Sequence, residues 1–108
     1  MIYTVEQIRA AVAPIAKKYN LRAVYLFGSY ARGTAGEASD IDLVIDTEGT
    51  DIKGLFALGA VYCDFEAALQ KNVDVITVNS IEQPARLPSE KAFRETVHKE
   101  RVMLYSAA

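Results

Sequence analysis

Three aspartates are the residues of this chain whose types and spacing most suggest chemistry. Asp40 and Asp42 alternate with Ile41 and Leu43, while Asp74 interrupts a run of valine, isoleucine and threonine. Side chains two apart on a strand share a face, so the first two carboxylates are expected about 7 Å apart. The two carboxylates repel each other, but a divalent cation that binds between them attracts both and offsets this repulsion. An isolated Asp-x-Asp is more often a solvated strand edge, and that alternative stays open for the pair alone.

A Gly-Ser pair precedes the acids and suggests a phosphate site. Gly28 and Ser29 follow an apolar segment, and ten residues separate Ser29 from Asp40. A glycine between a strand and a helix lets a phosphate approach the backbone N–H groups at the positive end of the helix. By itself the pair is usually only a turn. Combined with three acids that could hold two cations, it predicts in-line displacement at phosphorus, with Asp74 taking the proton of an attacking hydroxyl.

Hydrophobic periodicity predicts the elements that must position these residues. Four segments have helical spacing: 5–19, 30–34, 55–71 and 89–99. Four have the alternation or branched composition of strands: 21–27, 40–46, 73–78 and 102–105. Residues 80–88 are expected to form a proline-bounded connection, and Ser89 is expected to cap the last helix. Helix and strand thus alternate, which predicts a single α/β domain over residues 1–108. We expect a mixed sheet of about four strands, with helices packed on one side and the active site at one sheet end.

Composition excludes several classes of protein. The chain has 108 residues, 51% of them hydrophobic and 24% charged, with a net charge of −2. This balance argues against a protein that wraps duplex nucleic acid by releasing counterions. No apolar stretch approaches the length of a membrane span, no signal peptide is evident, and the single Cys63 cannot form an internal disulfide. These features predict a cytoplasmic protein that binds a small anionic ligand with the help of a metal.

The motif Leu-Phe-Gly-Ser-Tyr-Ala-Arg-Gly, followed by Ser-Asp-Ile-Asp-Leu, resembles the signature of the DNA-polymerase-β-type nucleotidyltransferase superfamily. The similarity is strongest to its minimal, stand-alone prokaryotic members and extends over nearly the whole chain. It implies Mg²⁺-dependent transfer of a nucleoside monophosphate, with ATP the expected donor, to a hydroxyl group. It further implies a small helical HEPN toxin as partner, with this chain as the antitoxin that attaches AMP to a tyrosine of that toxin.

The resemblance assigns roles residue by residue. The catalytic residues, which also hold two Mg²⁺ ions, are expected to be Asp40, Asp42 and Asp74. The nucleotide-binding residues are expected to be Gly28, Ser29, Arg32 and Ser39. Asp74 has the shortest match, because only Val-Asp-Val surrounds it.

Several of these residues have simpler explanations that the sequence leaves open. Arg32 could contact the triphosphate or pair with Glu37 or Asp40, and Ser39 could orient the acids or only form a turn. Asp64, on the third predicted helix, is expected to be solvated, as is Glu66. A basic stripe on the last helix could serve a partner or RNA, although a solvated face is the commoner meaning of such a pattern. The stripe consists of Lys91, Arg94, His98 and Arg101.

Two other functions remain compatible with the sequence. The chain could be an antitoxin that only binds its toxin, or a transferase that modifies a small molecule such as an antibiotic. The three acids argue against the first, and the lack of an acceptor-binding domain argues against the second. A chain of this length needs a partner protein or a second copy of itself to supply the acceptor surface, so a homo-oligomer is also possible.

Overall fold

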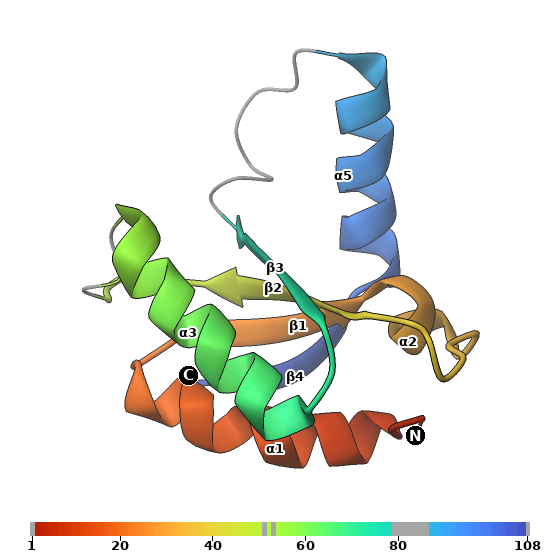
Figure 1. Ribbon diagram of the computed structural model, residues 1–108. Coiled ribbons are helices and arrows are strands. Elements are labelled where there is room, and N and C mark those ends of the chain that lie inside the picture. Colours follow the sequence, from red (N-terminus) through yellow and green to blue (C-terminus); the bar gives the residue numbers. More distant parts are fainter. Residues whose placement is uncertain (1, 51, 53, 79–86, 108) are drawn as a thin grey trace.

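The computed structural model describes residues 2–50, 52, 54–78 and 87–107, and it contains one four-stranded sheet in the order β3-β2-β1-β4 (Figure 1). The strands are β1 (Ala23–Phe27), β2 (Ile41–Asp46), β3 (Val73–Thr77) and β4 (Val102–Ser106). Strand β1 pairs antiparallel with β2 and with β4, whereas β2 and β3 are parallel. The predicted mixed α/β sheet of four strands is therefore confirmed.

A helix precedes each strand, as the periodicity predicts. The helices are α1 (Val5–Lys18), α2 (Gly28–Arg32), α3 (Gly54–Leu69) and α5 (Pro88–Glu100). Helix α1 begins with a capping box, in which the Thr4 hydroxyl accepts from the Gln7 N–H and the Gln7 side chain accepts from the Thr4 N–H. The N-cap of helix α5 lies two residues earlier than predicted, at Leu87 rather than Ser89, because proline suits the first turn of a helix. Most of the predicted connection over residues 80–88 lies outside the described residues.

The two faces of the sheet carry different residues. Alternation along β2 directs Ile41, Leu43 and Ile45 into the main core, which also contains buried residues of α1 and α3. Asp42 and Val44 lie on the opposite face. No described helix is long and apolar enough to cross a membrane.

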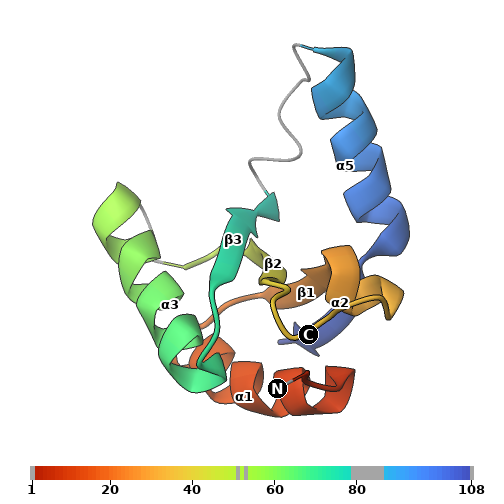
Figure 2. The same ribbon diagram turned by 45° about the vertical axis from the view of Figure 1, so that its right-hand side comes forward.

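Helix α5 packs on that opposite face, which differs from the expectation that all helices pack on one side. Its buried residue, Val97, contacts Val44 in a second small core, while α1 and α3 cover the first face (Figures 1 and 2). The sequence pattern of α5 shows that one side of the helix is apolar. It does not show which face of the sheet that side covers. The helix rises from the open face of the sheet beside the predicted acids.

Candidate active site

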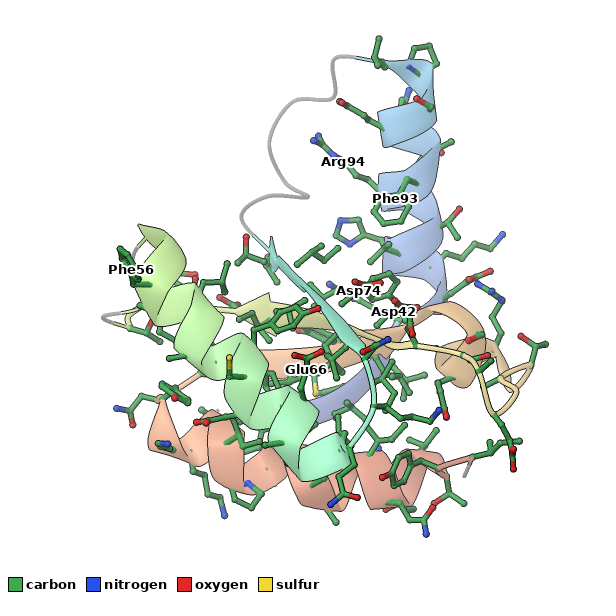
Figure 3. The ribbon with its side chains drawn as sticks, in the orientation of Figure 1. Asp42, Phe56, Glu66, Asp74, Phe93 and Arg94 are labelled. Atoms are coloured by element: carbon green, nitrogen blue, oxygen red, sulfur yellow. The ribbon has the colours of Figure 1, made fainter. Side chains whose placement is uncertain are left out.

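Strand register places two of the three predicted acids side by side. Asp42 is the partner of Phe27 on β1 and of Asp74 on β3, so these three residues form a row near one end of the sheet, at the end of β1 and the start of β2 and β3. Neighbouring strands lie about 4.8 Å apart, and residues in register point to the same face. Asp42 and Asp74 lie close together beneath α5 in Figure 3. The carboxylate pair thus depends on the β2–β3 pairing, which brings together residues far apart in the sequence.

The surroundings of Asp42 disfavour its negative charge. Burial, then the charge of Asp74 and a hydrogen bond with it, and then the charge of Asp40, together raise the pKa of this carboxyl to about 6, while Arg32 acts in the opposite direction. A carboxylate gains no folding stability from such a position. A group that binds preferentially to the ionised form, such as a cation, would relieve this cost.

Gly28 makes room for that carboxylate. Its φ of +73° lies in the left-handed region, and a Cβ at this position would collide with Oδ2 of Asp42. Glycine is required on both counts, because side chains rarely adopt this backbone conformation. The sequence suggests that the missing side chain admits a phosphate, and in the structure the same space lies against Asp42.

The acid pair opens into a cavity of about 520 Å³ between the sheet and α5. Gly28 and Arg32 of α2 line it together with Asp42 and Asp74. Its other walls are largely apolar, and Phe93 of α5 packs edge-on against Phe27 with 6.2 Å between ring centroids. A cavity of this size with a few polar groups at one end is typical of small-molecule sites.

Asp40 and Ser39 lie outside this cavity. Both line a neighbouring hollow with Lys71, whose ammonium group donates to the Ser39 carbonyl at 3.3 Å. The Ser39 hydroxyl accepts from the Gly36 N–H at 2.9 Å, which is the turn-forming role considered above. Asp40 is exposed, although its charge still influences Asp42.

Arg32 has a partner that the sequence does not predict. Its Nη1 donates to Oε2 of Glu100 on α5 at 3.1 Å, and the structure records no ion pair with Glu37 or Asp40 among the described residues. Ser29, the second residue of α2, is half-buried and lines neither hollow. The structure therefore gathers Gly28 and Arg32 around the acid pair, but not Ser29 or Ser39.

Residues 6–104 match the model of the nucleotidyltransferase domain family. The chain belongs to this family. A candidate protein adenylyltransferase of Methanocaldococcus jannaschii is 38% identical over 78 residues, which cover 71% of this chain and 81% of the relative. The protein adenylyltransferase MntA of Thermococcus cleftensis is 30% identical over 82 residues, covering 72% of this chain and 81% of the relative.

Solved structures of nucleotidyltransferase domains share the fold. A minimal nucleotidyltransferase superposes with a TM-score of 0.66 at 28% identity, covering 93% of this chain and 95% of that one. A chain of a toxin–antitoxin complex with AMP-PNP gives a TM-score of 0.69 at 21% identity, covering 92% and 73%. At the latter identity the likeness establishes the fold alone.

The residues of this nucleotidyltransferase domain are compatible with a divalent cation at Asp42 and Asp74. Hard cations such as Mg²⁺ bind to one or two carboxylates and retain water or phosphate oxygens as their other ligands. No group of three acidic, histidine or cysteine residues in the described part of the chain is arranged to hold a metal ion. The acid pair and the crowded carboxyl of Asp42 thus offer a partial ligand set that a substrate phosphate would complete.

Two aromatic residues of the site escape prediction from the sequence. Tyr62, at an apolar position in the helical spacing of residues 55–71, lines the cavity, and burial followed by the charge of Glu66 raises the pKa of its hydroxyl. Phe93, at an apolar position in the helical spacing of residues 89–99, is 49% exposed above the acids (Figure 3). Periodicity identifies both as apolar positions. It does not reveal that they face a cavity rather than the core.

Proposed function

We propose that this chain is a Mg²⁺-dependent adenylyltransferase that transfers AMP from ATP to a tyrosine hydroxyl of a HEPN-type partner toxin. The observation that carries the proposal is the pairing of Asp42 with Asp74 in a cavity that Gly28 and Arg32 also line. Membership of the nucleotidyltransferase domain family supports the reaction type, and the names of the relatives support a protein acceptor. The proposed setting is the cytoplasm, where ATP is available.

In the proposed reaction, the acceptor oxygen attacks the α-phosphorus of ATP. A new P–O bond forms, the bond between the α-phosphorus and the bridging oxygen breaks, and pyrophosphate leaves. Bound Mg²⁺, expected as two ions, would neutralise the charge that develops on the phosphate oxygens. Asp42 and Asp74 would hold the metal, and Asp74 is proposed to accept the proton of the attacking hydroxyl. Asp40, which lines the neighbouring hollow but whose charge acts on Asp42, is proposed to complete the metal site.

Residues of α2 are proposed to bind the phosphates. Backbone N–H groups of Gly28 and Ser29 lie at the start of this helix, and the Arg32 guanidinium lies at its end. Ser39 is proposed to support the loop that carries Asp40, through the turn that its hydroxyl forms with Gly36.

The acceptor is proposed to come from outside the chain. The cavity is open beside α5, and the described residues form no second domain that could enclose a macromolecular acceptor. Structural neighbours include a chain from the structure of a tri-AMPylated Shewanella oneidensis HEPN toxin in complex with MNT antitoxin. The superposition covers 96% of this chain with a TM-score of 0.65 at 17% identity. That likeness makes a HEPN toxin the first acceptor to test.

The test combines the purified chain with a HEPN protein encoded beside it and with ATP labelled on the α-phosphate. Label is expected on a tyrosine of the HEPN protein, located by mass spectrometry, and only when Mg²⁺ is present. The Asp42→Asn variant should transfer no label, while Asp46→Asn, on the same face of β2, should transfer it normally. Neutralisation of the toxin by Asp42→Asn as effectively as by the wild type would instead identify an antitoxin that acts by binding alone.

A further inference from the structure

An ion pair between α2 and α5 spans the mouth of the cavity. Arg32 is the last residue of α2 and Glu100 is the last residue of α5, and their side chains are 46% and 33% exposed. Both line the cavity that holds Asp42. Ion pairs with this degree of exposure contribute little to folding stability. The main effect of the Arg32–Glu100 ion pair is therefore to fix the position of the Arg32 side chain.

Apart from Glu100, the acidic residues that line the cavity together with Arg32 are Asp42 and Asp74. Arg32 and Asp42 line the same space, yet no ion pair between them is present in the structure. Arginine has a long flexible stem and five N–H donors, which suit a carboxylate well. Arg101, the residue that follows α5, stacks on the ring of Tyr25, with its Cζ 4.3 Å from the ring centroid. Glu100 thus competes with Asp42 for Arg32.

We infer that Glu100 is a positioning residue that holds Arg32 away from Asp42 and keeps the acid pair free to bind a divalent cation. This inference rests on the proposed function, because it assumes a metal at Asp42 and Asp74. If Arg32 paired with Asp42, it would neutralise a charge that attracts the metal and would compete for the same oxygen atoms. Holding Arg32 at the cavity mouth also leaves its remaining N–H groups available to a phosphate.

The test measures Mn²⁺ binding to the nucleotide-free protein by electron paramagnetic resonance of the free ion. Glu100→Ala is expected to weaken binding about fivefold, a typical size for coupling between sites. Glu95→Ala, on the same helix, is the matched control and should bind as the wild type does. Because the effect acts through Arg32, the double variant Arg32→Gln/Glu100→Ala should bind Mn²⁺ as tightly as Arg32→Gln alone.

The outcomes separate this inference from the function on which it rests. Wild-type affinity in Glu100→Ala would overturn the inference while leaving the metal site intact. Equal weakening in the presence and absence of Arg32 would overturn it too, since Glu100 would then act by another route. If the wild type bound no Mn²⁺ while Asp42→Asn behaved identically, the metal site itself would be refuted, and the inference with it.

Discussion

Replacing Asp42 with asparagine should stabilise the protein in the absence of metal. The carboxyl has an ordinary pKa of 3.8 and a pKa of about 6 in the fold. Two pKa units correspond to about 3 kcal/mol of unfavourable interaction when the group is ionised. Because Asp42 is partly exposed, water and salt screen this interaction, and we expect a net gain of about 1 kcal/mol. In a domain of this size, that gain raises Tm by about 4 °C.

The direction of this effect can be checked through the pH dependence of folding stability. A raised pKa means that the folded state binds the Asp42 proton more tightly than the unfolded state does. Wild-type stability should therefore fall as pH rises from about 4 to about 6 and level off above that range. The Asp42→Asn variant lacks this contribution. The difference in Tm between variant and wild type should be close to zero near pH 4 and largest above pH 6.

Thermal melts with a chelator, compared with melts in Mg²⁺-ATP, complete the test. At a hundredfold excess over Kd, Mg²⁺-ATP should stabilise the wild type by about 2.7 kcal/mol and Asp42→Asn by little. Asp46→Asn is the matched control, because it neutralises a carboxylate on the same face of β2 that lies 3.9 Å from the Arg22 guanidinium, so it should lower Tm slightly rather than raise it. The reasoning would be refuted if Asp42→Asn melted well below the wild type in chelator, since the carboxylate would then be a structural hydrogen-bond acceptor.

Two further substitutions test other contacts. Gly28→Ala should lower the free energy of unfolding by at least about 1–2 kcal/mol in urea titrations, because of the positive φ and the collision with Asp42. Gly33→Ala has a similar φ of +77° and open space around it, so an equal loss in both variants would show that the collision is unimportant. Asp64→Asn should lower Tm at neutral pH, because hydrogen bonds from Lys18 and Tyr19 lower the pKa of Asp64 and make its ionised form stabilising. This difference should vanish as pH falls below about 3.8, and its persistence in melts at low pH would contradict the charge-based explanation.

The elements of the fold are largely predictable from the sequence because their signals are local. Alternation identifies β2, and helical spacing with the Thr4 cap identifies α1. The face on which α5 packs is not predictable in this way. The contact that decides it, between Val97 and Val44, joins residues far apart in the chain.

In the candidate site too, local features are predictable from the sequence, whereas tertiary contacts are not. The sequence identifies Asp42 and Asp74 as acids on strands, but only the register of β2 and β3 makes them neighbours. The sequence leaves open whether Arg32 contacts a triphosphate or pairs with a nearby acid, and in the structure it pairs with Glu100 of α5. Asp64, expected to be solvated, has a side chain that is 33% exposed, and it also links α3 to α1 through Lys18 and Tyr19. These pairings depend on tertiary packing, and spacing along the chain cannot reveal them.

The strand order also has a consequence for the way the chain reaches its native state. Strand β1 pairs with β2, its near neighbour in the sequence, and with β4, which lies at the far end of the described chain. Closing the long loop between β1 and β4 costs more entropy than closing the loop between β1 and β2. The β1–β2 hairpin is thus the favoured nucleus, and it already contains Gly28 and Asp42. During folding, Gly28 and Asp42 would therefore reach their native positions next to each other before β4 joins the sheet.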